Sequence, residues 1–364
     1  MQEQPKALPP FSCSYSPAIP ELLLQLRCTL AISTYQAGKV VFISPRADGE
    51  NLIQLPRTFK KAMGIALHDQ KMAIATMEEV LVLVNSPQLA AHYPRQPQTY
   101  DALYMPRATY FTGQIDIHDL DYGANGDLYA VNTSFSCLIR IDDNYSFTPI
   151  WKPPFISHLA SEDRCHLNGM AMQNGSPKYV TAFSTGDSVQ SWREVVTTGG
   201  IIMDVESNEF IATEVPMPHS PRLFDGALYL LLSATGELIR MDIQTGKYDV
   251  VCKLDGFVRG LARCGEYAFI ALSRLRKNSS TFAKLKIADI ANQAGIAVIH
   301  LPTGAFVGEI KYHMSVDEIY DVQVLPGLLR PGILNTDRPE YKMGLATPNA
   351  TYWARPDAKK DPKS

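Results

Sequence analysis

Residues 219–254 read HSPRLFDGALYLLLSATGELIRMDIQTGKYDVVCKL, and the fold of the whole chain can be worked out from their pattern. Polar residues lead into an apolar run, a turn at Asp225–Gly226 and a second apolar run, and the same arrangement follows around Gly246. Turns of this kind between apolar runs are typical of β-hairpins. The segment therefore predicts four short antiparallel strands in succession.

The four-strand pattern recurs along the chain, with the last unit incomplete. Equivalent positions in the first strand of each unit are Gly64, Asp119, Gly169, Pro221, Gly260 and Asp321. Their spacing averages about 51 residues, which is in the range of a propeller blade. Helical periodicity is confined to Ile19–Leu26 and Ser280–Ala294.

The incomplete last unit is supplemented from the other end of the chain. Gly327 is followed by prolines and a polar tail, whereas TLAISTYQAGKVVFISPRADGENLIQL (29–55) matches the three missing strands. We predict an all-β, six-bladed β-propeller whose closing blade joins one C-terminal strand to three N-terminal strands, so that the ring has no open edge. The predicted divisions are an N-terminal extension with a short helix (1–28), the propeller (29–327) and a C-terminal extension with a mobile tail (328–364).

Composition excludes several classes of partner. The 364 residues include 34 basic and 37 acidic side chains, so the net charge of −3 gives no field that would attract nucleic acid or anionic lipid. The apolar run Leu22–Ser33 contains Gln25 and Arg27, and it predicts neither a signal peptide nor a membrane span. We expect a cytoplasmic protein whose six cysteines, without a CxxC pair, are reduced thiols.

Three connections are long for a compact fold: 85–110, 184–198 and 274–293. They contain aromatic residues that disordered segments tend to lack, so we predict lids over one mouth of the ring. The alternative is padding, because surface loops tolerate extra length at little entropic cost. The last of the three carries the one basic run, with Arg274, Arg276, Lys277, Lys284 and Lys286, and could select an anionic substrate.

Polar residues stand just before several inner strands, where a core would not place them. His118, His166 and His219 come from three successive units, and the ring should bring them toward one axial opening. Imidazoles are ligands that zinc, copper or iron prefer, so we predict that these histidines hold a divalent transition metal. Alternatively, each histidine donates to a loop carbonyl or acts without metal in a binding pocket.

The same rim supplies the other candidate site residues. Arg259 suits a carboxylate or other anion, although an ion pair with Glu318 or Asp116 is the alternative. Glu318 and Tyr320 are the candidate catalytic groups, which would handle protons. The candidate substrate-binding residues are Arg259, Asn168, Arg222 and Trp192. No GxSxG, HExxH or GxxxxGKS motif occurs, so we expect no nucleotide cofactor.

Several motifs resemble those of a bacterial family of conserved hypothetical propellers without an assigned activity. They are SPAIPELLLQLRCTLAISTYQAGKVVF (16–42), HLNGMA (166–171), MPHSPR (217–222), GFVRGLA (256–262) and EIYDVQVLPG (318–327). The resemblance spans almost the whole chain. It implies the propeller fold and no particular reaction.

More distantly, the chain is similar to the gluconolactonase and regucalcin-like six-bladed propellers. That resemblance implies a metal-binding role for Asn168 in LNGMA and a further polar ligand at His118–Asp119. The chain departs from those propellers at Met63 and Arg259, where they carry acidic ligands. Loss of oxygen ligands and gain of imidazoles argue against calcium and toward a softer metal or none.

Together these features predict a metal-dependent enzyme of hydrolase or lyase type that acts on a small or peptidic anionic substrate at the lidded mouth. The alternative is a non-catalytic propeller that presents its mouth or blade edges to a peptide or protein partner. We favour the enzyme over the binding module. Neither nucleic acid nor a membrane is an expected partner.

Overall fold

The structure is a computed structural model that describes residues 8–275, 282 and 285–354. Arg276, Lys277 and Lys284 of the predicted basic lid therefore lie outside the described residues, and so does the predicted mobile tail 356–364.

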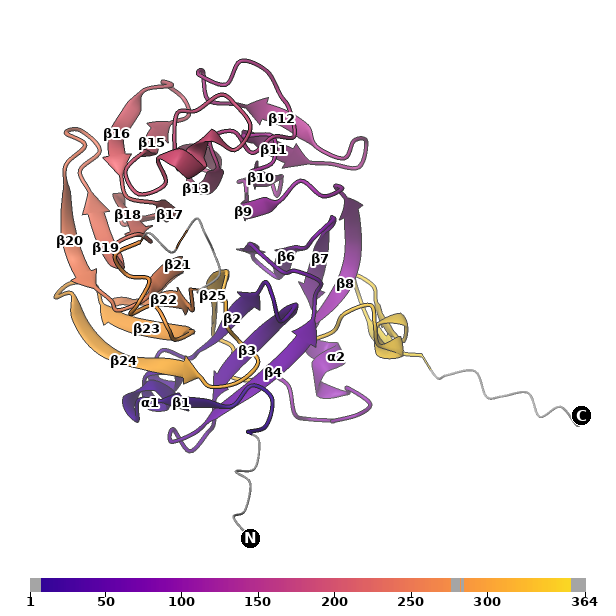
Figure 1. The fold of residues 1–364 in the computed structure, drawn as a ribbon. Coiled ribbons are helices and arrows are strands. Elements are labelled where there is room, and N and C mark those ends of the chain that lie inside the picture. The colour runs from indigo at the N-terminus through magenta and orange to yellow at the C-terminus, as the bar shows by residue number, and fades with distance from the viewer. Residues whose placement is uncertain (1–7, 276–281, 283–284, 355–364) are drawn as a thin grey trace, which may run out of the picture.

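Six small sheets stand in a ring around one axis (Figure 1), which confirms the predicted all-β six-bladed propeller. From the axis outward, the first three complete blades are β5(Ile65–His68), β6(Lys71–Ala75), β7(Glu79–Asn85), β8(Ala102–Phe111); β9(Ile117–Tyr122), β10(Leu128–Asn132), β11(Cys137–Ile141), β12(Thr148–Trp151); and β13(Leu167–Gln173), β14(Ser176–Ala182), β15(Gly200–Asp204), β16(Phe210–Val215). The fourth and fifth are β17(Pro218–Phe224), β18(Ala227–Leu232), β19(Glu237–Met241), β20(Tyr248–Lys253); and β21(Phe257–Cys264), β22(Tyr267–Ser273), β23(Gly295–His300), β24(Ala305–Tyr312).

The closing blade combines both ends of the ring, as predicted. Its inner strand β25(Asp321–Pro326) pairs antiparallel with β2(Cys28–Thr34), in a register that runs from Cys28 opposite Pro326 to Ser33 opposite Asp321. The outer strands are β3(Lys39–Pro45) and β4(Leu52–Thr58). Backbone pairing between distant parts of the sequence therefore closes the ring.

Short elements outside the ring extend two blades. On the N-terminal side, β1(Cys13–Tyr15) pairs with β24, and α1(Ala18–Gln25) forms where a helix was predicted. On the C-terminal side, β26(Pro331–Ile333) pairs parallel with β8. The remaining elements are α2(Pro87–Ala91), η1(Ser191–Glu194), η2(Pro339–Lys342) and the hairpin β27(Gly344–Ala346)–β28(Thr351–Trp353). The described part of Ser280–Ala294 contains turns rather than the expected helix.

The core lies between neighbouring blades rather than inside any one of them. Between the second and third blades, for example, Val131 and Leu138 pack with Leu167, Met170 and Ile201, and all five are almost fully buried. Both faces of each sheet are covered, which explains why the strands have continuous apolar runs.

Hydroxyl groups at the ends of the second strands connect neighbouring blades near the axis. Four of these side chains donate to a carbonyl at the start of the next blade's inner strand: Ser33 to Met63, Thr133 to Leu167, Ser233 to Val258 and Ser273 to Ile319. We call these four bonds the hydroxyl latches. Because they repeat around the ring, they hold successive inner strands in a common register.

Aspartates at two of the aligned repeat positions make a second kind of connection. Asp119 accepts a hydrogen bond from the backbone N–H of Met170, and Asp321 accepts one from that of Ile65. In both cases the donor lies one residue past the aligned position of the next blade. The sequence alignment of the repeats is thus correct in space.

Two of the three long connections lie at the predicted mouth, and one does not. The loops after β14 and β22 join second strands to third strands, at the end where inner strands begin. The predicted 85–110 loop is wrong as a lid: it includes strand β8, and its remaining part joins a third strand to a fourth, at the opposite end. There Leu89 and Tyr93 pack with Leu334 and Trp353 of the C-terminal extension.

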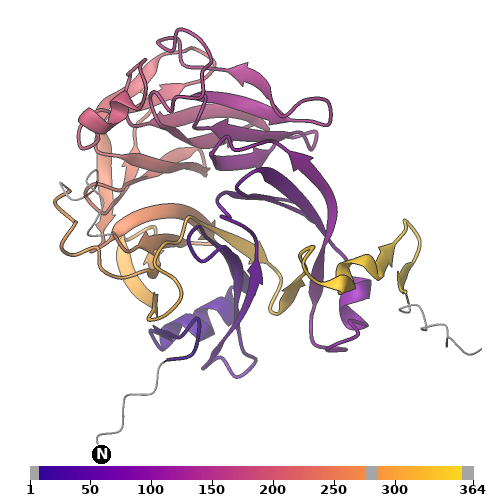
Figure 2. The same cartoon turned by 45° about the vertical axis from the view of Figure 1, so that its right-hand side comes forward.

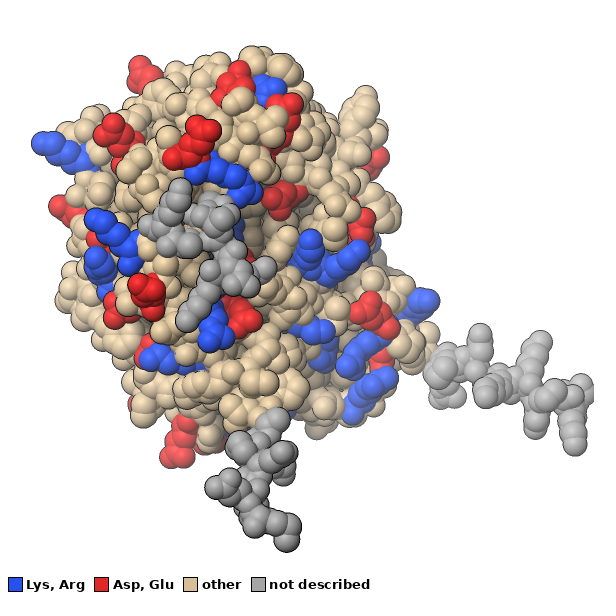
Figure 3. All heavy atoms as spheres, viewed as in Figure 1, with Lys and Arg blue, Asp and Glu red and all other residues tan. Residues whose placement is uncertain are grey.

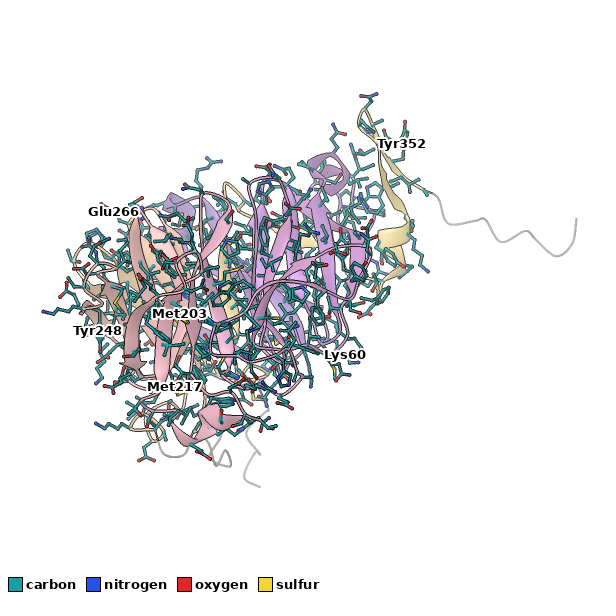
Figure 4. All side chains as sticks on the ribbon, turned by 90° about the horizontal axis from the view of Figure 1, so that it is seen from above. Lys60, Met203, Met217, Tyr248, Glu266 and Tyr352 are labelled. Carbon is teal, nitrogen blue, oxygen red and sulfur yellow. The ribbon has the colours of Figure 1, made fainter. Side chains whose placement is uncertain are left out.

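Figure 4 shows the ring edge-on and separates the two faces. Met217, which lines the mouth, and Lys60 lie toward one face, and Glu266 in the turn before β22 lies toward the other. Tyr352 of the C-terminal hairpin stands out beyond that second face (Figure 4). The turned view in Figure 2 shows the same hairpin outside the ring, next to α2.

Among the described residues, no helix is both long and apolar enough to cross a membrane.

Candidate functional site

The mouth opens into a cavity with two lobes that share Tyr35, His166, Arg193, Arg259, Phe282 and Glu318. The larger lobe has a volume of about 480 Å³, and we call it the apolar lobe because its further lining includes Phe183, Met217, Phe257 and Leu275. The smaller lobe, of about 320 Å³, is called the polar lobe and is further lined by Asp116, His118, Asp163, Gln190, Trp192 and Tyr320. A cavity of this size suits a small molecule.

Two of the three predicted histidines are in direct ring contact. The rings of His118 and His166 meet edge to face with centroids 4.9 Å apart. His118 Nδ1 donates to the carbonyl of Asp116 at 3.1 Å, and burial lowers the pKa of His118 to about 4. Its imidazole is therefore neutral at physiological pH, with the proton on Nδ1 and a lone pair on Nε2.

His219 is held in the same tautomer by a hydroxyl latch. The hydroxyl of Ser233 donates its one hydrogen to the carbonyl of Val258, so its oxygen accepts from His219 Nδ1 at 2.6 Å. Burial lowers the pKa of His219 well below its usual value. A neutral imidazole with an unprotonated Nε2 results.

An aromatic cluster surrounds His166. Its ring lies 4.4 Å from that of Trp192 and 4.6 Å from that of Phe183, measured between centroids. Phe183 also contacts His219 edge to face at 5.0 Å. The lid residue Trp192 is thus packed down onto the floor of the mouth, where it covers His166.

Asp163 fixes both the lid and this histidine, although no motif or repeat position marks it in the sequence. Its carboxylate accepts from Trp192 Nε1 at 2.9 Å and from His166 Nδ1 at 3.0 Å. The base of the same lid is anchored by Arg164, which donates to Glu162 and Asp187 at 2.7 Å each. Both residues lie in a connection between blades that has no counterpart in the repeat pattern.

Arg259 lies on the floor shared by the two lobes. Its guanidinium carbon stands 3.6 Å from the centroid of the Tyr320 ring, and its side chain is only 12% exposed. Within the described part of the chain, its one hydrogen-bonding partner is Glu318, at 3.5 Å. Burial raises the pKa of Tyr320 well above its usual value, so the phenol keeps its proton.

Arg222 and Asn168 lie deeper along the axis. Arg222 donates to both carboxylate oxygens of Asp119, at 2.8 and 3.1 Å, and it lines a cavity of about 260 Å³ at the opposite end of the ring from the mouth. Asn168 Oδ1 accepts from Thr181 at 2.7 Å. Both side chains line a much smaller cavity on the axis that also touches His118 and His219. Substrate contact by either residue stays a prediction.

The described residues on the mouth side carry charges of both signs. Figure 3 shows acidic and basic side chains intermixed over most of this face, with Lys and Arg more numerous toward β4 and α2. The described charges on this face therefore do not produce a broad potential that favours ligands of one sign.

A family described as a domain of unknown function matches residues 17–334, which is most of the chain. The chain belongs to the DUF4915 family. This confirms the resemblance to a propeller family of unassigned activity, and it does not confirm the gluconolactonase-like particulars. No curated protein matches the chain.

Solved structures similar to this DUF4915 chain include a chain in the crystal structure of a nidogen/laminin complex and a protein of unknown function from Bacteroides caccae. Each is 8% identical, superposes with a TM-score of 0.50 and covers 82% of this chain; the match spans 99% of the first structure and 98% of the second. At that identity the likeness shows the propeller fold and nothing about function.

Metal binding by the three histidines of this DUF4915 chain gains no geometric support. Among the described residues, no group of three or more His, Cys, Asp or Glu side chains is placed to hold a metal ion. His118 and His166 touch, but Phe183 packs against both His166 and His219. The predicted zinc, copper or iron site therefore stays a prediction.

Proposed function

We propose that the mouth cavity binds a small organic anion through Arg259. The observation that carries this proposal is a nearly buried guanidinium with one long ion-pair contact to Glu318 and further N–H donors. Burial of a charged donor without strong partners is costly, and a carboxylate or similar anion supplies the missing acceptors in a bidentate arrangement. Stacking on Tyr320 holds the guanidinium plane in place before the ligand arrives.

The rest of the ligand is apolar. Beside Arg259 the apolar lobe presents Phe183, Met217, Phe257 and Leu275, which would bury a hydrocarbon or aromatic group of the ligand. The ligand class is therefore an amphipathic anion with one apolar group, small enough for a lobe of about 480 Å³. An apolar amino-acid side chain next to a peptide's terminal carboxylate has the same chemistry.

We further propose that the protein acts on this anion as an enzyme of hydrolase or lyase type. Glu318 and Tyr320 both line the polar lobe, next to the proposed anion site. The protonated phenol of Tyr320 can donate to a developing negative charge, and the carboxylate of Glu318 can accept a proton. A metal ion is not needed for these steps.

Two alternatives to this proposal have their own tests: a metal site at the histidines and a non-catalytic binding module. Metal analysis of protein purified without a histidine tag, compared with a His118→Ala/His219→Ala variant, tests the predicted metal site. The binding-module alternative assigns no chemistry to the mouth. It predicts that the wild type, Glu318→Gln and Tyr320→Phe alike convert no ligand bound at the mouth.

Anion binding is tested by calorimetry with phenylacetate and its neutral isostere phenylacetamide. We expect phenylacetate to bind and phenylacetamide to bind at least about tenfold more weakly, because the charge-assisted bonds to Arg259 are lost. Arg259→Met should remove the difference. The matched control is Arg263→Met on the same strand β21, where the guanidinium pairs with the exposed Asp225. Equal binding by the wild type and the Arg259→Met variant overturns the proposal.

A further inference from the structure

A small cavity on the propeller axis lies directly beneath the mouth. It is lined by His118, Asp119, Asn168, His219, Ser220, Arg222, Arg259, Tyr320 and Asp321, and it leaves about 10 Å³ for the centre of a water molecule. We call it the axial cavity. Its volume admits a single oxygen atom and excludes a carboxylate or phosphate group.

Two hydrogen-bond donors at this cavity have no partner in the part of the chain that the structure describes. Asn168 Nδ2 and the hydroxyl of Tyr320 are buried, and neither is hydrogen-bonded to any described residue. The two side chains are only 4% and 5% exposed, respectively. A buried donor left in this state costs about 1–3 kcal/mol. Two such donors lining one cavity indicate that the cavity receives an acceptor.

Two hydrogen-bond acceptors line the same cavity. His118 and His219 both use Nδ1 to donate to protein oxygens, and a neutral imidazole in this tautomer keeps a lone pair on Nε2. Each ring therefore has an unprotonated Nε2. An oxygen atom held by these rings must itself carry hydrogen, which excludes a carbonyl or ether oxygen.

The carboxylates at this cavity are already engaged. Asp119 accepts from Arg222 and from the backbone of Met170, and Asp321 accepts from the backbone of Ile65 and Val322. The pattern presented to a guest thus consists of two donors, Asn168 and Tyr320, and two imidazole acceptors. A water molecule satisfies all four groups, and an alcohol oxygen satisfies both donors and one of the two imidazoles.

We propose that the axial cavity is a subsite for one hydroxyl oxygen, filled by water in the free protein and by a hydroxyl group of the bound anion. This inference rests on the proposed function, and it narrows the ligand class to a hydroxycarboxylate with an apolar group. Arg259 lines the axial cavity and both lobes, so the hydroxyl and the carboxylate must lie close together on the ligand. A 2-hydroxy acid meets that requirement.

Matched pairs of acids test the subsite by calorimetry. Phenylacetate and 3-phenylpropanoate are compared with mandelate and 3-phenyllactate, each as separate enantiomers, which differ from the parent acids by one hydroxyl group. We expect one enantiomer of a hydroxy acid to bind about tenfold more tightly than its parent, because its hydroxyl gains the bonds that Asn168 and Tyr320 otherwise lack.

Tyr320→Phe removes the unpartnered hydroxyl and keeps the ring beneath Arg259. In this variant the preference for the hydroxy acid over its parent acid should fall to about twofold or less. Tyr122→Phe is the matched control, because the Tyr122 hydroxyl is also buried, has no partner among the described residues and lies outside the cavities at the mouth. That variant should keep the full preference.

The outcomes separate this inference from the proposed function. If phenylacetate binds through Arg259 and no hydroxy acid binds better, the subsite is wrong and the anion site stands. If none of the acids binds, both proposals fall. A crystal structure of the free protein should show one water oxygen within hydrogen-bonding distance of Asn168 Nδ2 and the Tyr320 hydroxyl, and an empty cavity or a metal ion there contradicts the inference.

Discussion

Arg222 in the fourth blade donates two hydrogen bonds to Asp119 in the second blade, so that one ion pair links two blades that are not neighbours in the ring. Burial opposes the charge of Arg222, but the carboxylate of Asp119 raises the pKa of the guanidinium above its usual value. Asp321 of the closing blade also contributes to this field, and burial raises its pKa to about 6. The ion pair thus lies where three blades meet.

Arg222→Met should lower the free energy of unfolding by about 3–5 kcal/mol, because it leaves Asp119 buried without its cation. Urea denaturation followed by fluorescence measures the change. Arg263→Met, which breaks the exposed pair with Asp225, should cost less than about 1 kcal/mol. Adding Asp119→Leu to Arg222→Met should restore part of the loss, and an additive effect of the two changes would contradict this account.

Stability should decrease as the pH falls from 6.5 toward 4. Burial lowers the pKa of His118 to about 4 and that of His219 well below its usual value, so the unfolded chain binds more protons than the folded chain in this range. The stability that these neutral imidazoles contribute is present above pH 6.5 and is lost on acidification, by up to about 1.4 kcal/mol per pH unit for each.

Asp321 changes the stability of the folded chain in the opposite direction between pH 6 and 3.8. Its pKa is raised from the usual 3.8 to about 6, so the folded chain takes up the proton first and gains stability as the pH falls. His219→Gln should therefore flatten the fall in stability, and Asp321→Asn should steepen it. Denaturation curves at half-unit pH intervals check both signs, and equal pH profiles for the two variants would refute them.

Ser233→Ala should change the protonation site of His219. In the wild type, ¹⁵N shifts of the His219 ring should show hydrogen on Nδ1. The Ser233 hydroxyl donates its hydrogen to the carbonyl of Val258, so it can only accept a hydrogen bond from Nδ1. The variant loses this acceptor and about 1–3 kcal/mol of stability. Ser273→Ala breaks an equivalent latch that binds no histidine, and it should cost similar stability without altering the His219 shifts.

Two glycines with the same backbone conformation should respond differently to alanine. Gly226 (φ +80°) lies in the open turn after β17, and a Cβ there meets no atom within 4 Å. Gly260 (φ +77°), next to Arg259, would place a Cβ 2.9 Å from the Cα of Asp321. Gly226→Ala should lower the free energy of unfolding by about 1–2 kcal/mol, because alanine disfavours the left-handed conformation. Gly260→Ala should lower it clearly more, because the added Cβ also clashes with the neighbouring blade. Thermal denaturation compares them, and equal losses would show that blade contact at Gly260 is unimportant.

The repeat pattern was enough to predict the ring, its closure and the axial position of His118 and His219. It was enough because a propeller places equivalent residues of every unit at the same height and radius. The predicted lid at 85–110 was wrong because Pro106 and the polar residues after it conceal strand β8, and a missed strand assigns the loop to the wrong face.

Side-chain arrangement at the mouth could not be obtained in the same way. Register places His166 near His219, but nothing in the repeat shows that Phe183 packs against both rings. Asp163, which fixes Trp192 and His166, lies in an irregular connection without periodicity. The hydroxyl latches did have a signal, a Ser or Thr at the end of the second strand in several units, as in Ser233 and Ser273.

Pairing of β2 with β25 has a consequence for synthesis of the protein on the ribosome. About 290 residues separate Ser33 from its partner Asp321, so the first blade strand made must wait for the last one before its edge is covered. Glu318 and Tyr320 emerge in the same final step. A nascent chain that stops short of this point has both an exposed strand edge and an unfinished mouth, so only the fully translated ring has every blade edge covered.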